Sequence, residues 1–142
     1  MKSKRFIFKD HKADMFIEAY GKSYPEALEN CAAGLFETIC DASKLKERKK
    51  LLVKEKASTL EQLTTFLLNK IVSEGDAREM MYKRMKVIKF EEKKGMYSVK
   101  AQVFGQEAVH KLGRMYVKAV THHEATVEKK GKNWLIRVLP DI

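Results

Sequence analysis

The sequence is poor in cysteine, and this scarcity limits how the fold can be cross-linked. Its 142 residues contain 2 cysteines, Cys31 and Cys40, and no Cys-x-x-Cys pair, so a structural zinc site is not expected. The two cysteines fall nine residues apart in one expected helix, and that separation spans roughly 13 Å along a helix axis. No disulfide bridges such a distance. We expect both to be small core residues in a reducing compartment.

Long apolar runs and flexible linkers are also missing. No window of about 18 apolar residues exists, so no segment is expected to span a membrane. The basic start, Met1–Arg5, is followed by only a short apolar run, Phe6–Phe8, which is too short for a signal peptide. No repeat, low-complexity tract or Pro/Gly-rich linker divides the chain. These absences predict one cytoplasmic domain over residues 1–142, with a single sizeable core.

The catalytic motifs that a sequence can reveal are absent as well. No serine lies in a nucleophile elbow, neither cysteine is placed for pairing with a histidine, and there is no Gly-rich phosphate loop. We therefore expect a protein that is not an enzyme. The remaining enzymatic hypothesis is metal-assisted hydrolysis at a carboxylate-bound ion, which is poorly supported because no base accompanies such an ion.

Positive charge is the strongest compositional signal that the sequence does carry. Lys and Arg number 29 against 19 Asp and Glu, which gives a formal net charge of +10. This balance favours a polyanionic partner, such as RNA or an acidic protein surface. The alternative is the lysine-rich, solvated surface of a thermophile protein, in which Lys and Glu are both abundant. Composition leaves both interpretations open.

Two amphipathic helices are predicted. Ser23–Glu26 has the pattern of a capping box with a proline in the first turn, and the helix that follows should end near Asp41. Ser58 and Thr59 offer caps for a second helix, which should stop near Gly75. Apolar stripes that must face a core are Leu28, Cys31, Ala32, Leu35, Phe36 and Ile39 in the first helix, and Leu60, Leu63, Leu67 and Ile71 in the second.

The other segments have the alternation and turn signals of strands. Gly21, Gly95 and Gly131 mark turns between them. Two helices with about six or seven mostly antiparallel strands indicate an α+β fold. The expected strands cover residues 6–8, 13–20, 51–57, 81–92, 96–104, 117–129 and 134–138.

Acidic oxygens gather at both ends of the chain. Asp10, His11 and Asp14 lie close together near the start, and Asp141 stands beside the α-carboxylate of Ile142. Mg²⁺ and Ca²⁺ take oxygen ligands and favour ionised ones. The two groups can share an ion only if the fold brings the chain ends together. The alternative is that one group is a solvated turn and the other a frayed end.

Several blocks of the sequence resemble the archease family. The first, His-Lys-Ala-Asp at residues 11–14, is similar to the His-Thr-Ala-Asp signature of that family. The resemblance spans the whole chain, with a weaker middle between about Lys44 and Gly95. Archeases are small proteins, with helices packed on sheet, that activate RtcB-type RNA ligases in tRNA splicing. The other matching blocks are residues 19–23 (Ala-Tyr-Gly-Lys-Ser), 28–37 (Leu-Glu-Asn-Cys-Ala-Ala-Gly-Leu-Phe-Glu), 117–123 (Val-Lys-Ala-Val-Thr-His-His) and 138–142 (Val-Leu-Pro-Asp-Ile).

The resemblance implies a metal site built from both chain ends. In the family, residues that match Asp14, Asp141 and the terminal Ile142 hold a divalent ion, so we expect Ca²⁺, Mg²⁺ or Mn²⁺ there. The oxygens of Ile142 would contribute to the site while its side chain packs. His11 and Asp10 are expected to orient the ligands by hydrogen bonding or to contact a partner.

Further expectations concern Lys12 and the strand over residues 117–129. Lys12 replaces the family threonine, and its ammonium group should point to solvent, away from the cation site. Lys118 and His123 match family positions. Alternation puts Lys118 and His122 on the outward face and His123 on the inward face. Lys118 is either a contact to an acidic ligase surface or phosphate, or a solvated lysine, and His123 either a partner contact or a satisfied core histidine.

These residues lead to two functional hypotheses. The resemblance implies a non-catalytic, metal-binding activator of an RtcB-type RNA ligase, which promotes guanylylation and multiple turnover of the ligase. The alternative is a chaperone or modulator of tRNA-modifying enzymes that binds RNA or protein through the basic stretches 44–56 and 83–94. In either case tRNA is a further candidate partner, and no membrane partner is expected.

Overall fold

Seven strands and two long helices make up the described part of the chain. The computed structural model describes residues 5–11 and 14–142, with the side chains of residues 10, 11 and 14 outside the description. The elements in chain order are β1 (Phe6–His11), β2 (Asp14–Gly21), α1 (Tyr24–Ile39), the 3₁₀ turn η1 (Ala42–Lys44), β3 (Lys49–Ala57), α2 (Leu60–Arg78), β4 (Met80–Lys93), β5 (Met96–Glu107), the 3₁₀ turn η2 (His110–Leu112), β6 (Ala119–Lys130) and β7 (Asn133–Asp141).

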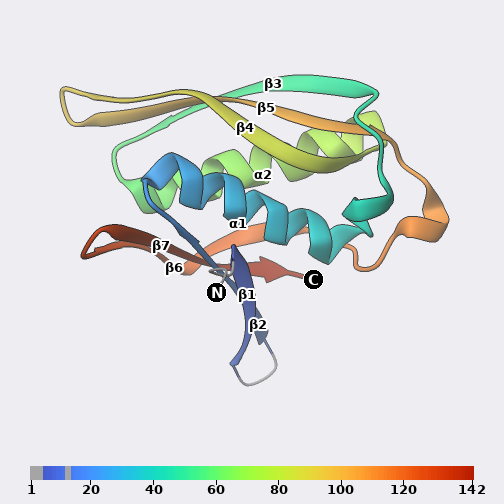
Figure 1. The fold of residues 1–142 in the computed structure, drawn as a ribbon, viewed down its shortest axis with the longest axis horizontal. Helices are drawn as coiled ribbons and strands as arrows, with labels where there is room; N and C mark the ends of the chain where they lie inside the picture. The colour runs from blue at the N-terminus through green and yellow to red at the C-terminus, as the bar shows by residue number, and fades with distance from the viewer. Residues whose placement is uncertain (1–4, 12–13) are drawn as a thin grey trace.

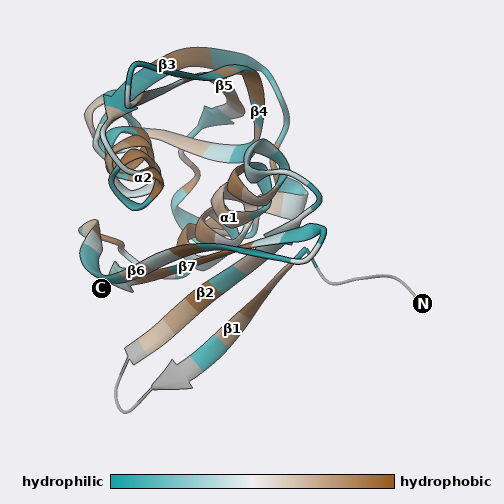
Figure 2. Cartoon of the chain, turned by 90° about the vertical axis from the view of Figure 1, so that its left-hand side faces the viewer, coloured by the Kyte–Doolittle hydropathy of each residue, from teal (hydrophilic) through white to brown (hydrophobic). Residues whose placement is uncertain are grey.

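The elements form three layers, with both helices between two sheets (Figures 1 and 2). One sheet has the strand order β1-β2-β7-β6 and the other β3-β5-β4, and all the strand pairs are antiparallel. Helix α1 contacts β2 and β4, and α2 contacts β6 and β3, so each helix touches both sheets. The predicted α+β fold is confirmed. No helix among the described residues is long and apolar enough to cross a membrane.

Helix α1 begins with the predicted capping interactions. The Ser23 hydroxyl accepts the Glu26 N–H at 3.2 Å, and the Glu26 carboxylate accepts the Lys22 N–H at 2.8 Å. Both cysteines are buried and free, as expected. Burial raises the pKa of Cys31 to about 12 and that of Cys40 to about 11. Of the predicted stripe, Leu28, Cys31, Ala32, Leu35 and Phe36 are buried, and Ile39 is partly buried.

Helix α2 runs past its predicted end near Gly75 and reaches Arg78. Gly75 is a buried packing position inside the helix, because a Cβ there would lie 3.2 Å from the Tyr82 ring. The left-handed conformation that glycine usually supplies after a helix is taken instead by Glu79, with φ of 54°. The prediction of the helix end was wrong because the glycine serves the contact with β4.

A bulge in β6 overturns the predicted alternation along that strand. The register of β6 on β7 shifts between Thr121 and Thr126, and Glu124 has a left-handed φ of 59°. Extra residues on one strand of a pair change which face the following side chains occupy. Before the bulge, Val120 is buried and Thr121 is partly buried.

Both histidines in the bulge are exposed, but they have different neighbours. His122, predicted to face outward, approaches α2, where its Nδ1 hydrogen-bonds with the Thr65 hydroxyl and its ring lies edge-on to Phe66. His123, predicted to face inward, has a side chain that is 78% exposed and lies 3.9 Å from the Glu124 carboxylate. The interpretation of His123 as a core histidine was wrong.

Candidate functional site

The four-stranded sheet brings both acidic segments to one end of a ladder. Strands β2 and β7 are paired from Ile17 with Val138 to Gly21 with Trp134. Asp14 precedes Ile17 by three residues, and Asp141 follows Val138 by three residues. The backbones of Asp14 and Asp141 therefore both lie beyond the same end of this ladder, which is the arrangement that a shared ion requires.

The last strand is held in place up to Asp141. The Asp141 carbonyl oxygen accepts the Lys118 N–H at 2.8 Å, and Asp141 pairs with Ala119 in the ladder. Its side chain is exposed, as is the side chain of Lys118. Ile142 follows the last paired residue and is 55% exposed, so the expectation that its side chain packs was wrong. Ile142 thus lies beyond the last ladder pair, with more than half of its surface exposed.

A cavity of about 310 Å³ lies beside the end of β7. Since a water molecule takes up about 30 Å³ of liquid, this volume has room for an ion with several waters. The wall is mostly apolar, and Asp141 supplies the one carboxylate side chain in the described lining. The lining residues are Phe8, Met15, Ile17, Thr38, Met115, Thr121, Leu139, Pro140, Asp141 and Ile142.

The β1–β2 hairpin supplies one wall of this cavity through Phe8 and Met15. In the hairpin, His11 pairs with Asp14, and Asp10 pairs with Met15. The side chains of Asp10, His11 and Asp14 lie outside the described residues, as does all of Lys12. Among the side chains that are described, no group of three or more His, Cys, Asp and Glu residues is arranged around a metal position.

Of the predicted site residues, the described structure brings three together and leaves one apart. Asp141 and Ile142 line the cavity, and Lys118 is bonded to the Asp141 backbone. His123 lies in the β6 bulge and does not line the cavity. This end of the sheet can present carboxylate oxygens and a lysine side by side.

Two residues that sequence reasoning missed hold the edge strand β6 and the segment before it. Asn69 of α2 binds Val120 twice: its side-chain amide donates to the carbonyl oxygen at 2.8 Å, and its side-chain oxygen accepts the N–H at 2.7 Å. Arg114 donates to the Glu37 carbonyl oxygen at 3.0 Å and to the Glu37 carboxylate at 2.8 Å. These bonds fix the segment that leads to Lys118.

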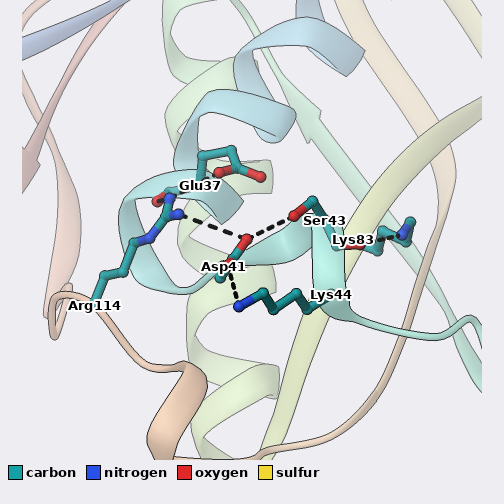
Figure 3. Close-up of polar contacts among 6 residues, drawn as sticks. All are labelled: Glu37, Asp41, Ser43, Lys44, Lys83 and Arg114. Carbon is teal, nitrogen blue, oxygen red and sulfur yellow. Dashed lines mark hydrogen bonds and ion pairs between the residues drawn. The ribbon is translucent and has the colours of Figure 1, made fainter.

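The Arg114 cluster extends to Asp41 at the end of α1 (Figure 3). The Arg114 guanidinium lies 3.6 Å from the Asp41 carboxylate, which also accepts the Ser43 hydroxyl at 2.7 Å and lies 3.6 Å from the Lys44 ammonium. The Ser43 hydrogen bond, with the charges of Arg114 and Lys44, lowers the pKa of Asp41 from its ordinary value. No sequence signal indicated this cluster, because Glu37 and Arg114 are 77 residues apart.

The fold and this strand end define a small α+β protein in which two helices lie between two antiparallel sheets and a carboxylate-bearing strand end borders a cavity. The model of the Archease protein family (MTH1598/TM1083) matches residues 6–142. The chain belongs to the archease family.

Individual relatives match along nearly their whole length. Protein archease of Sulfurisphaera tokodaii is 31% identical over 138 residues, with 97% of this chain and 99% of that protein covered. Protein archease of Methanosarcina barkeri is 29% identical over 141 residues, with 98% and 97% covered.

Solved structures share the fold. The solution structure of Methanobacterium thermoautotrophicum protein 1598 is 26% identical with a TM-score of 0.84, and the match covers 99% of this chain and 100% of that one. A crystal structure from Thermotoga maritima, described as an archease and possible chaperone, is 18% identical with a TM-score of 0.61 and 94% of each chain covered. At that identity the second likeness concerns the fold alone.

Proposed function

We propose that this archease is a non-catalytic, divalent-metal-binding activator of an RtcB-type RNA ligase in cytoplasmic tRNA splicing. The observation that carries the proposal is the β2–β7 ladder, which sets the backbones of Asp14 and Asp141 beyond the same end of one sheet. The cavity beside Asp141 and Ile142 adds the volume that a hydrated ion needs.

In this proposal Asp14, Asp141 and the oxygens of Ile142 hold the ion. Carboxylate and carbonyl oxygens are the ligands that Ca²⁺, Mg²⁺ and Mn²⁺ prefer. When bound, the ion supplies positive charge at the strand end. The bond from the Lys118 N–H to the Asp141 carbonyl oxygen keeps this end of β7 in register, and the exposed Lys118 side chain is free to meet an acidic or phosphate-bearing partner.

The role on the ligase would be to promote its guanylylation and to allow multiple turnover. His11, Asp10 and Lys118 are the proposed partner contacts around the ion. His123 remains a partner contact in this proposal because its side chain is exposed.

A second candidate function is a chaperone or modulator of tRNA-modifying enzymes. The Thermotoga maritima neighbour is described as a possible chaperone, and the basic stretches of this chain supply a charged surface. The two candidates differ in the residues that they require. An activator depends on Asp14 and Asp141, whereas an electrostatic chaperone depends on lysines in residues 44–56 and 83–94.

A ligation assay with a purified RtcB-type ligase tests the proposal. We expect this protein to raise the number of turnovers, and Asp141→Asn to remove the increase. Glu128→Gln, an exposed carboxylate farther along β6, is the matched control and should keep it. Absence of stimulation by the wild-type protein would overturn the activator role, and full stimulation by Asp141→Asn would overturn the metal assignment.

A chain extension tests the strand end in the same assay. A neutral Gly-Ser extension after Ile142 should impair stimulation, because Ile142 borders the cavity and directly follows the paired Asp141. The same extension placed before Met1 is the control and should be tolerated. Full stimulation by the protein with the extension after Ile142 would show that this end of the chain is not part of the functional site.

A further inference from the structure

The outer face of the β3-β5-β4 sheet has an unusual distribution of charge. Both helices lie on the other side of this sheet (Figures 1 and 2), so its outer side chains are not needed for the core. We define the outer face by four rows of paired residues across β3, β5 and β4. The rows are Lys50–Phe104–Arg84, Leu52–Gln102–Lys86, Lys54–Lys100–Lys89 and Lys56–Ser98–Glu91.

Seven of these twelve positions are cations and one is a carboxylate. The outer face therefore holds more than half of the net charge of +10. Two cations have carboxylate partners: Arg84 binds Glu47 at 2.7 and 3.0 Å, and Lys89 lies 3.8 Å from Glu91. The cations without an ion pair among the described residues are Lys50, Lys54, Lys56, Lys86 and Lys100.

The third row is the most informative, because it places three lysines directly opposite one another. Lys54 on β3 pairs with Lys100 on β5, which pairs with Lys89 on β4. Adjacent strands are about 4.8 Å apart, and like charges directly opposite destabilise a sheet. The fold thus carries an electrostatic cost here that its own packing does not require and that the Lys89–Glu91 pair offsets only in part. A bound polyanion would remove that cost.

We propose that the outer face binds the phosphate backbone of a nucleic acid without reading its sequence, a role that rests on the second candidate function, in whose basic stretches the cations of this face largely lie. Lysine is depleted at the centre of protein–protein interfaces, whereas Lys and Arg contacts to phosphate dominate nucleic-acid affinity. Successive rows are about 7 Å apart along the strands, so the four rows offer cations at regular intervals over about 20 Å. A phosphodiester chain, with one negative charge per nucleotide, complements such a periodic surface.

The polar and apolar residues of the outer face fit the same ligand. Gln102 and Ser98 lie between the lysines and offer hydrogen bonds to sugar or phosphate oxygens. Leu52 is 46% exposed and gives a small apolar contact. The Phe104 ring is already covered by the Arg84 guanidinium at 4.1 Å, so strong base stacking on this face is not expected.

Fluorescence anisotropy with a labelled oligouridylate of about 20 nucleotides tests the proposal. The measurement uses the full chain with EDTA and without ligase, so its outcome is independent of the metal site and of ligase activation. We expect binding that weakens steeply as salt rises. The triple variant Lys54→Gln/Lys89→Gln/Lys100→Gln should bind on the order of tenfold more weakly and lower the salt slope by about 2, at about 0.7 per lost contact.

The matched control is Lys129→Gln/Lys130→Gln/Lys132→Gln, which removes the same charge from the hairpin between β6 and β7. It should keep most of the affinity. Equal loss in both triple variants, or no binding by the wild type at low salt, would overturn the outer face as the site. Equally tight binding of polyglutamate would assign the outer face to acidic protein and overturn a nucleic-acid ligand.

Urea denaturation of the same triple variant adds an independent readout. Removing the opposed charges should raise the denaturation midpoint, because the row costs stability in the free protein. A lower midpoint would show that the lysines stabilise the sheet by packing, and would remove the reason for assigning them to a ligand.

Discussion

The two sheets of this protein have similar inner faces but carry charged groups of opposite sign in different places. Toward the helices both present small and branched apolar residues, such as Ile17 and Val138 in the four-stranded sheet and Val99 and Val103 in the three-stranded sheet, all at most 3% exposed. The cavity with the carboxylate of Asp141 lies on the helix side of the four-stranded sheet, with Thr38 of α1 in its lining. The outer face of the three-stranded sheet carries rows of lysines.

This difference separates what the fold requires from what it leaves open. The inner faces must fill the space around α1 and α2 at high packing density, so their residues are constrained by shape and apolarity. The strand end that carries Asp141 and the outer face of the three-stranded sheet have no such task. Their contrasting chemistry, acidic at one strand end and basic across the opposite sheet, is therefore the better guide to function.

The largest expected effect comes from a substitution that disrupts the three-stranded sheet. A Cβ on Gly105 would collide with the Met81 carbonyl oxygen on the neighbouring strand β4, so Gly105→Ala should lower the free energy of unfolding by about 3 kcal/mol. Gly131→Ala is the control: this turn glycine has φ of 62° and open space around it, and should lose only about 1 kcal/mol. Urea denaturation measures both, and equal losses would contradict the close approach of β4 and β5.

The second prediction tests the carboxylate of Asp141 at the end of β7. Asp141→Asn should weaken divalent-ion binding at least tenfold, because a neutral amide replaces the proposed ionised ligand, while the fold stays intact. Asp14→Ala should act in the same direction. Calorimetry with Ca²⁺, Mg²⁺ and Mn²⁺ provides the measurement, with Glu128→Gln as control. Unchanged affinities in both variants would contradict the assignment of a metal site to this end of the sheet.

The third prediction concerns the exposed Arg114 cluster at the end of α1. Hydrogen bonding by Ser43, with the charges of Arg114 and Lys44, lowers the pKa of Asp41 below its ordinary value of 3.8. The folded state therefore releases this proton more readily than the unfolded chain does. The resulting stabilisation is complete above the ordinary value and is lost as pH falls through the folded-state pKa.

Arg114→Ala should make stability less dependent on pH in this acidic range, and should cost little at neutral pH because the pair is exposed. Arg78→Ala is the control, since it breaks an exposed pair with Glu74 in α2 that does not involve Asp41. Urea midpoints at neutral and acidic pH provide the measurement. A variant with the same acid sensitivity as the wild type would show that Arg114 does not act through Asp41.

The smallest expected effect sharpens the description of β6. Glycine adopts positive φ without strain, so Glu124→Gly should raise the free energy of unfolding by about 0.5 kcal/mol, because residue 124 has φ of 59°. Glu128→Gly, in the regular part of the strand, should instead lower it by about 0.5–1 kcal/mol. Denaturation curves measure both changes in the free energy of unfolding. Opposite signs would confirm the positive φ at residue 124, and a lower free energy of unfolding in both variants would contradict it.

Local signals predicted much of the fold. Ser23 and Glu26 fixed the start of α1 because a cap needs only residues a few positions apart. Strand alternation predicted a strand over residues 96–104, and β5 covers Met96–Glu107. The family signature, rather than any local pattern, pointed to Asp14 and Asp141 as one site.

Contacts between distant residues explain the failures. Gly75 reads as a helix stop until Tyr82 is known to pack against it. The exposed position of His123 follows from a bulge that no periodicity indicated. Arg114 has no local pattern, since its role depends on a partner 77 residues away.

The burial of Cys31 and Cys40 makes the middle layer a built-in reporter of opening. Alkylation requires an accessible thiolate, and burial holds the pKa of these thiols at about 12 and about 11. In the folded state neither sulfur should react at an appreciable rate near neutral pH. The rate at which a thiol reagent labels the protein would then measure how often the helices separate from the sheets, and nucleic acid or a divalent ion that stabilises the closed form would slow the labelling.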